Sequence, residues 1–390
     1  MPHTRPTWAY SLPAALMLMA PFDLLASLAM DIYLPAVAAM PHTLGTTPAI
    51  VQLTLSLYLL GIGVGQVLFG PVSDRIGRRP VLMGGALIFA ASSSLLASTT
   101  WAAGFVTLRL LQALGASAAL VATFATVRDV YGDRPESATI YGTFSSMLAL
   151  VPALGPILGA ALFDSFGWSS IFWLLALLTV PPVIHAAFRW HETKPDGEGG
   201  NRSAWPILHS PSFWFYTLAF GTAMGTFFVF LSIAPRILIS RAGYTEMQFS
   251  LTFATAASVM VVTARFAGAF VIRWGIDGCV ERGMALLMIG AAMLAAAWLF
   301  GSPGFATLIL PMWIMAVGIV VTVSVTANGA LAPFADRAGT AVAIYFAGQS
   351  IIVSVLGTTA VLLLGGDTAW PLIGFATTLA AIVILIGRWR

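Results

Sequence analysis

The chain has 390 residues, of which 59% are hydrophobic and only 8% are charged. A typical soluble domain carries about 25% charged residues, and the mean hydropathy of +0.92 lies far outside the range of such domains. Apolar runs long enough to cross a bilayer as helices recur along the whole sequence. Together these properties exclude a soluble globular domain and predict an all-α polytopic membrane protein. The single cysteine, Cys279, excludes an internal disulfide and a cysteine metal cluster.

We expect twelve transmembrane helices. Their predicted bounds are 13–36, 48–71, 80–98, 102–125, 139–162, 168–189, 211–234, 248–271, 282–300, 304–330, 339–364 and 368–387. A chain with ten or eleven spans is the alternative, and it would require two glycine-rich runs to be re-entrant. The first apolar run lies too far from a small-residue cleavage site for a removable signal peptide. We therefore expect that run to remain as the first helix.

The positive charges predict the orientation in the membrane. Of the 18 lysines and arginines, only Arg109 and Arg265 fall inside the predicted spans, since Arg189 and Arg282 are end residues of theirs. If the N-terminus is cytoplasmic, all the others except Arg236 and Arg241 fall on the cytoplasmic side. The positive-inside rule then predicts a cell (inner) membrane protein with both termini in the cytoplasm. The excess of basic residues is explained by this asymmetry and implies no nucleic-acid partner.

The spans divide into two groups of six. Residues 189–210, RWHETKPDGEGGNRSAWPILHS, form the longest hydrophilic stretch, and their glycines, prolines and charges are typical of a flexible cytoplasmic linker. We predict an N-terminal six-helix half at 1–188 and a C-terminal six-helix half at 211–390. Parallel repeats of this kind are typical of secondary transporters whose substrate site lies between the halves.

The loops that follow the second and the eighth span resemble each other. They read GPVSDRIGRRP, residues 70–80, and GAFVIRWGIDG, residues 268–278. The matching positions are, pairwise, Gly70 and Gly268, Arg75 and Arg273, and Gly77 and Gly275. Asp74 has no counterpart, since Ile272 replaces it. The match supports an internal repeat because both loops occupy the same place in their half.

The first copy of this loop is predicted to act as a cytoplasmic gate. Pro71 and Gly77 permit a tight reversal between helices. Asp74 is expected to face a cation or a helix N-terminus and so to latch the two halves together. The predicted gate residues are Gly70, Asp74, Arg75, Gly77, Arg78, Arg79, Arg128 and Asp129. A short basic loop that only obeys the positive-inside rule is the alternative, and Asp129 could equally be a solvated charge.

Four stretches carry a family resemblance. GPVSDRIGRRP resembles the signature loop of the major facilitator superfamily. LRLLQALGASAA, residues 108–119, and VPALGPILGA, residues 151–160, resemble the helix-four and helix-five motifs of its drug:proton antiporter branch. DIYLPAVAAMP, residues 31–41, resembles the drug-resistance proteins of that branch. Over nearly every span the chain looks like the florfenicol/chloramphenicol exporters.

This resemblance implies the export of phenicol antibiotics from the cytoplasm, coupled to protons that enter. It implies a small-molecule drug as partner, no cofactor beyond the proton gradient, and a monomer, because one six-plus-six chain encloses a complete pathway. A broader multidrug exporter and a nutrient permease of the same fold are the alternatives. The helix-five motif and the lack of polar sugar-binding side chains disfavour the permease.

Three ionisable residues inside the spans are the candidate coupling site. Asp23 and Asp31 lie in the first apolar run and Arg109 lies in the fourth. With a rise of about 1.5 Å per residue, Asp23 is expected near the middle of the bilayer and Asp31 and Arg109 nearer its outer side. Ionisable residues at such depth usually face a cavity or a partner. The resemblance assigns proton and substrate binding to the two aspartates. The alternatives are a permanently neutral Asp23, a solvated Asp31 at the helix end, and a purely structural Arg109.

Small residues recur in the fifth span at the spacing that lets helices approach closely. They are Pro152, Gly155, Pro156 and Gly159. We expect a tightly packed seam that seals the cavity against proton leak, and a general membrane packing motif is the alternative. The residues expected to line an apolar and aromatic drug cavity are Ser27, Tyr33, Tyr58, Phe228, Phe230, Tyr345 and Gln349.

A membrane enzyme is the rival from another class of protein. The histidines lie at the N-terminus, in loops or near a span end: His3, His42, His185, His191 and His209. The sequence contains no HExxH, GxSxG or phosphate-binding glycine loop. We therefore expect no catalytic residues and no metal, and the absence of a nucleotide-binding domain disfavours a primary pump.

Overall fold

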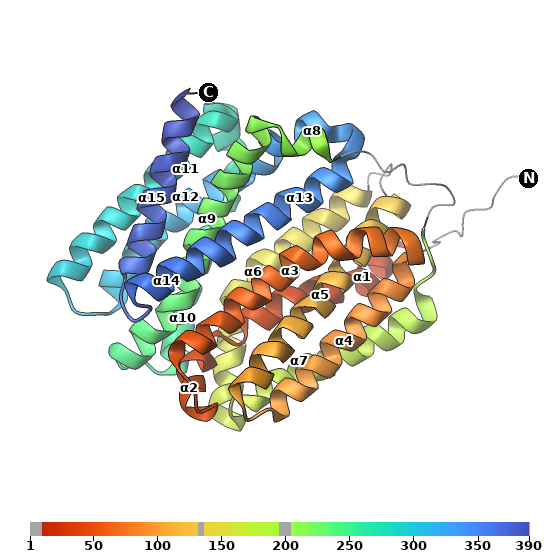
Figure 1. Ribbon diagram of the computed structural model, residues 1–390, viewed down its shortest axis with the longest axis horizontal. Coiled ribbons are helices and arrows are strands. Elements are labelled where there is room, and N and C mark those ends of the chain that lie inside the picture. The colour runs from red at the N-terminus through yellow and green to blue at the C-terminus, as the bar shows by residue number, and fades with distance from the viewer. Residues whose placement is uncertain (1–9, 132–135, 195–203, 390) are drawn as a thin grey trace, which may run out of the picture.

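The computed structural model describes residues 10–131, 136–194 and 204–389, and these residues are almost entirely helical (Figure 1). The N-terminal bundle contains α1 (Leu12–Asp31), η1 (Leu34–Ala38), α2 (Met40–Thr43), α3 (Pro48–Ile76), α4 (Arg78–Ser98), α5 (Ala102–Tyr131), α6 (Glu136–Phe166) and α7 (Ser169–Arg189). Within it α5 packs against α3 and α4, while α7 packs on α4 and α1 on α6. All the predicted spans of the first half therefore have a helical counterpart.

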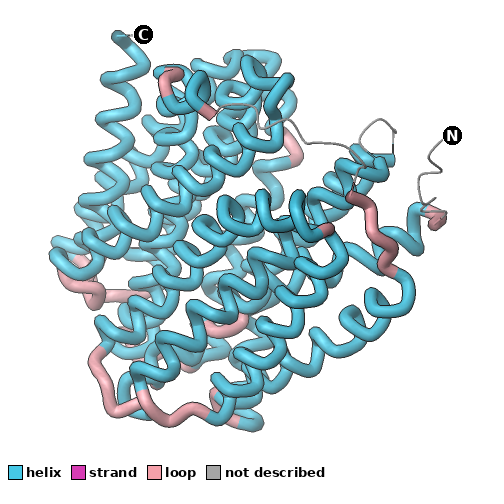
Figure 2. Tube along the Cα trace, turned by 45° about the vertical axis from the view of Figure 1, so that its right-hand side comes forward, coloured by secondary structure: helices cyan, strands magenta, loops and turns pink. Residues whose placement is uncertain are grey.

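The C-terminal bundle repeats this pattern. It contains α8 (Trp205–Leu208), α9 (Pro211–Pro235), η2 (Arg236–Arg241), α10 (Glu246–Ala264), α11 (Ala267–Phe300), η3 (Phe305–Ile309), α12 (Leu310–Leu331), η4 (Ala332–Arg337), α13 (Ala338–Ile351), η5 (Ile352–Gly357), α14 (Thr358–Leu364) and α15 (Trp370–Trp389). Here α12 packs against α11 and α9, and α15 packs against the same two helices. Loops are confined to the ends of the helices, as Figure 2 shows.

The described helices confirm the all-α membrane fold. Eleven of the described helical segments are long and apolar enough to cross a membrane, and a shorter apolar segment, Leu150–Phe166, belongs to α6. A transmembrane helix has to satisfy every backbone polar group internally, which is why these apolar runs fold as helices. The run Pro211–Arg241 is the most enclosed of them, with 89% of its apolar window buried inside the protein. The division of the chain at residues 188 and 211 stays a prediction.

Two glycines at matching places in the repeat turn the chain. Gly77 separates α3 from α4 with φ +109°, and Gly275 kinks α11 with φ +67°. Side chains with a Cβ rarely adopt these conformations, so the glycines are required by the backbone. Pro71 takes no part in the reversal, contrary to the prediction, because α3 continues through it to Ile76.

The predicted end of the eighth span, at residue 271, is wrong. Helix α10 ends at Ala264, where the amide of Phe266 bonds back to Thr263 and closes a turn. Arg265 is exposed just after this end rather than inside a helix. The expected second loop is therefore a helical start of α11 that bends at Gly275.

The two bundles contact each other along two pairs of helices. We call the face that carries the C-terminal end of α15 and the corner between α3 and α4 the terminal face, and the opposite face, which carries α2, the far face (Figure 1). At the interface α3 packs against α13, and α6 packs against α10. The Ser56 hydroxyl hydrogen-bonds to the Thr358 hydroxyl, and Ser250 Oγ donates to the Pro156 carbonyl oxygen at 2.9 Å. Both bonds lie toward the far face, so the two bundles are in contact on that side.

Candidate functional site

Arg109 lies at the centre of the N-terminal bundle and is completely buried. Its Nη1 donates to the carbonyl oxygen of Ala29 in α1 at 3.2 Å and to Gln112 Oε1 at 2.6 Å. Gln112 Nε2 in turn donates to Ser93 Oγ of α4 at 2.8 Å. The guanidinium thus connects α1 to α4 from its position on α5.

Three aromatic rings surround the same guanidinium. Its central carbon lies 4.5 Å from the ring centroid of Tyr58, 5.0 Å from that of Tyr33 and 5.9 Å from that of Phe172. Desolvated cation–π contacts of this kind stabilise a charge that has lost its water. The Tyr58 hydroxyl donates to the Ala26 carbonyl oxygen at 2.7 Å, which holds that ring in place. Tyr33 and Tyr58, predicted to line a drug cavity, therefore contact Arg109.

The two aspartates of α1 are also buried. Asp23 is 1% exposed and Asp31 is 6% exposed. Neither carboxylate makes an ion pair with Arg109, because the ion pairs found among the described residues all involve Arg78 or Arg128. Asp23 Oδ2 has no hydrogen-bond partner, and neither have Nε and Nη2 of Arg109. One buried cation and two buried carboxyl groups therefore share the bundle without neutralising each other by direct contact.

Helix α6 reaches this region through its glycines. A Cβ added at Gly155 would lie 3.0 Å from the Asp31 Cβ, and one added at Gly159 would overlap the carbonyl of Ile32. The Pro156 carbonyl accepts the bond from Ser250, as described above. The predicted close-packed seam is thus present, and the helices that face it are α1 and α10. Its role as a seal against protons stays a prediction.

The predicted gate loop forms a network around Arg78, whose side chain is almost fully buried. Nη1 of Arg78 donates to Asp74 Oδ1 at 2.6 Å, and Nε donates to Asp129 Oδ2 at 2.8 Å. Arg128 touches Asp129 more loosely, at 3.3 Å. Asp129 therefore joins Asp74, as one reading of the sequence predicted. The expected latch between the halves is wrong for this conformation, since these residues all belong to the N-terminal bundle.

The remaining predicted cavity residues lie in two further places. Tyr345 stacks on Phe220 at 4.8 Å and donates to Thr326 Oγ1 at 2.9 Å, so it is built into the C-terminal bundle. Phe230 stacks on Phe253 at 5.5 Å. Phe228 and Gln349 are buried on α9 and α13, and Ser27 is half-buried on α1. The structure brings Tyr33 and Tyr58 together at Arg109, whereas Tyr345 and Phe230 take part in two separate ring contacts of the C-terminal bundle.

Sequence analysis missed Gln112 and Ser93. Gln112 follows Arg109 by three residues, a spacing that places both side chains on one face of a helix. That spacing was a usable signal. Ser93 lies in a different helix, and no local pattern connects it to the site.

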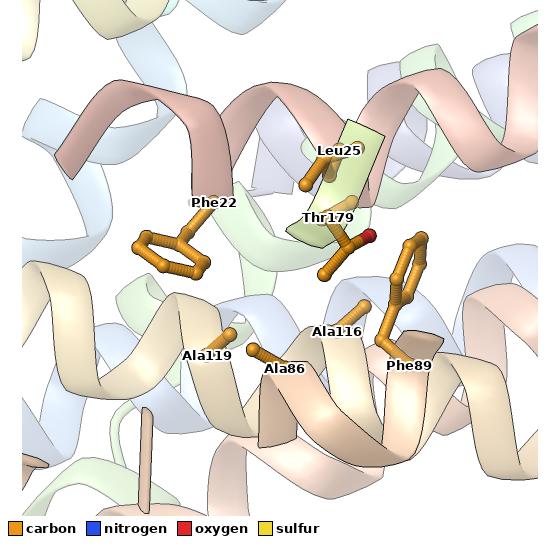
Figure 3. Close-up of a pocket in the computed structure, with 8 residues that line it drawn as sticks. Phe22, Leu25, Ala86, Phe89, Ala116, Ala119 and Thr179 are labelled. Atoms are coloured by element: carbon orange, nitrogen blue, oxygen red, sulfur yellow. The ribbon is translucent and has the colours of Figure 1, made fainter. Parts of the chain in front are cut away.

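The two cavities described for this part of the chain do not contain the candidate site. Figure 3 shows a small apolar cavity of about 10 Å³ between α1, α4, α5 and α7, with Phe22 and Thr179 in its wall. It has room for one water molecule at most. A larger cavity of about 400 Å³ opens on the terminal face between α9, α11 and α15, lined by Asp277, Glu281 and Arg388 among others. Neither cavity is lined by Asp23, Asp31 or Arg109.

Two bundles of membrane helices with a repeated corner and buried charges are typical of membrane transporters. The family model described as "Major Facilitator Superfamily" matches residues 22–358, and the chain belongs to this superfamily of multi-pass membrane transporters.

Comparisons with individual proteins agree with this assignment. The chain is 47% identical over 382 residues to a "Chloramphenicol resistance protein" of Pseudomonas aeruginosa, covering 97% of this chain and 91% of the relative. It is 27% identical to "Multidrug resistance protein MdtL" of Citrobacter koseri, covering 92% and 88% of the two chains.

Solved structures share the fold. The crystal structure of a POT family transporter in complex with 5-aminolevulinic acid has a TM-score of 0.78 at 12% identity, covering 99% of this chain and 96% of that one. That of a D-xylose-proton symporter has a TM-score of 0.74 at 16% identity, covering 96% and 97%. At such low identity the likeness shows the fold alone.

Proposed function

We propose that this transporter exports phenicol antibiotics, chloramphenicol and florfenicol, from the cytoplasm in exchange for protons. The proposed substrate is supported by the 47% identity, over nearly the full chain, to a protein named for chloramphenicol resistance. The more distant relatives named for multidrug resistance support a broader drug exporter as the second candidate. Export of drugs is common to both.

The buried charges support coupling to protons. Asp23 has an unpaired carboxylate oxygen in the same bundle as a guanidinium that keeps two unpaired nitrogens. An unpaired buried carboxylate is costly as an anion, so it gains by taking up a proton. A drug that enters this region displaces the water that such a charge needs and competes with the proton. Arg109 cannot itself lose its proton and serves to hold the charge balance of the site.

The contact between the bundles on the far side belongs to one state of the proposed transport cycle. With the termini in the cytoplasm, the far face is outside the cell. The bonds between Ser56 and Thr358 and between Ser250 and Pro156 then hold the bundles together on the outer side. Alternating access requires this contact to open when the drug is released outside the cell.

Transport into proteoliposomes under an imposed pH gradient tests the proposal. We expect the wild-type protein to concentrate florfenicol against its gradient and Asp23→Asn to lose this ability. Asp164→Asn, an exposed aspartate near the far end of α6, is the matched control and should transport normally. Accumulation by Asp23→Asn that still follows the pH gradient would move the coupling role to Asp31. A wild-type protein that ignores the pH gradient would refute proton antiport.

A further inference from the structure

A carboxylate from the segment after α7 closes the corner between α3 and α4. Helix α4 begins at Arg78, and its N-cap residue is Gly77, which has no side chain to cap the helix. The first amides of a helix have no partner within it. Here Glu192 supplies one: its Oε1 accepts from the amide of Arg78 at 2.8 Å and its Oε2 from the amide of Arg79 at 3.1 Å.

The segment that carries Glu192 is itself held on the corner. We call residues 190–194 the strap. The amides of Thr193 and Lys194 also donate to Glu192 Oε1, each at 3.0 Å, so the carboxylate receives four backbone N–H groups. Lys194 Nζ donates to the Arg75 carbonyl oxygen at 2.7 Å, on the other side of Gly77. The strap is thus bound both to the end of α3 and to the start of α4.

The electrostatics agree with this geometry. Partial burial raises the pKa of Glu192, but the four backbone N–H donors lower it and prevail, so its pKa lies below the usual range. A carboxylate at a helix N-terminus is also stabilised by the helix dipole. Glu192 is therefore ionised at neutral pH and acts as a permanent cap.

The corner between α3 and α4 leaves no room for a side chain at position 77. A Cβ added at Gly77 would overlap the Glu192 carboxylate, and the φ of +109° disfavours any other residue. Gly77 is thus required for two reasons: its backbone has a positive φ, and the absence of a Cβ lets the strap approach.

We propose that Glu192 is a positioning residue for transport, which acts through Arg78. The amide of Arg78 is fixed by Glu192, while its side chain spans Asp74 and Asp129. Because the backbone atoms and the guanidinium belong to one residue, loss of the cap frees the first turn of α4 and misplaces the guanidinium between its two carboxylates. The strap, predicted to be a flexible linker, is a fixed part of the gate. This inference rests on the transporter function and does not depend on which drug is carried.

The first arm of the test needs no substrate. In lipid nanodiscs, we expect amide hydrogen exchange of a peptide covering residues 73–82 to be at least about tenfold faster in Glu192→Gln than in the wild type, because exchange reports local opening. Glu246→Gln is the matched control, since Glu246 is also a partly exposed glutamate at a helix start but lies on the far face. Unchanged exchange in Glu192→Gln would overturn the cap, whatever the protein transports.

The second arm asks whether the cap acts through Arg78. We expect Glu192→Gln to lower the maximal export rate by about tenfold while the equilibrium Kd for the drug changes by less than about twofold. In an Arg78→Ala background the same substitution should add less than about twofold, because effects on one network are not additive. An equal loss in both backgrounds would show that Glu192 does not act through Arg78. Glu192→Asp, which keeps the charge, serves as the milder variant if Glu192→Gln does not fold. It too should lower the export rate more in the wild-type background than in the Arg78→Ala background.

Discussion

At the scale of single residues, several polar and aromatic groups gather around one buried arginine, Arg109. Removing a cation from water costs several kcal/mol unless partners replace the hydration. Arg109 receives a carbonyl oxygen, an amide oxygen and the faces of three rings, yet no carboxylate. A planar guanidinium fits this combination because it bonds at its edge and stacks on its face, which an ammonium cannot do.

We therefore expect Arg109→Lys to abolish drug export although the charge is retained. Gln112→Leu should lower export by about tenfold, because Arg109 loses its 2.6 Å partner, an effect in the range of a charge-assisted hydrogen bond of about 1.5–3 kcal/mol. Growth in the presence of chloramphenicol and uptake into vesicles measure both effects. Gln66→Leu, a half-buried glutamine on α3, is the control and should behave as the wild type. Normal export by Arg109→Lys would show that the site requires a positive charge at position 109 but not the planar shape of the guanidinium.

At the scale of elements, the spacing between α6 and α1 is set by two glycines. Membrane helices have little hydrophobic drive to associate, so small residues that permit close backbone approach matter more than in water. The two positions differ in the room they leave. Gly155 faces the Asp31 side chain with a contact that a small shift relieves, whereas Gly159 faces the backbone carbonyl of Ile32. A backbone atom cannot move aside as a side chain does.

This difference predicts an order of effects. Gly159→Ala should destabilise the protein by about 1–3 kcal/mol, the usual cost of overpacking, and should reduce export strongly. Gly155→Ala should be milder on both counts, and Gly155→Leu should resemble Gly159→Ala. Thermal unfolding in detergent and vesicle transport report the two properties. Gly84→Ala is the control, since a Cβ there meets no atom within 4 Å. The reverse order would contradict the packing described for this seam.

At the scale of the whole molecule, the two bundles touch on the far side. The hydroxyls of Ser56 and Thr358 are in contact, so cysteines at these positions are close enough for a disulfide. Transport by alternating access requires the contact to open.

Oxidation of a Ser56→Cys, Thr358→Cys pair should therefore stop export, and reduction should restore it. The native cysteine, Cys279, is buried and would be replaced by alanine in this experiment. Vesicle transport before and after addition of a reductant measures the effect, with each single cysteine variant as control. Full transport by the oxidised, cross-linked protein would mean that the far side does not open during the cycle.

Features that depend on neighbouring residues could be predicted from the sequence, whereas contacts between distant residues could not. The length of apolar runs predicted the helices, and the spacing of glycines predicted the repeated turn at Gly77 and Gly275, because both signals are local. The burial of Asp23 and Asp31 followed from their apolar neighbours. The attachment of Glu192 to Arg78 could not be predicted, since these residues lie 114 positions apart. The failed latch has the same origin: Asp74 found its cation four residues away, within its own bundle.

The bond between Arg109 and Ala29 also lies at the end of the first helix. Ala29 lies in the last turn of α1, where carbonyl oxygens have no amide to accept from within the helix. The Arg109 guanidinium donates a hydrogen bond to the Ala29 carbonyl oxygen, and the chain continues as the 3-10 helix η1. The end of α1 is therefore bonded to a residue of α5. A bound molecule that attracts the guanidinium away from Ala29 would free the end of α1 to extend or unwind, next to Asp31 and beside the seam with α6.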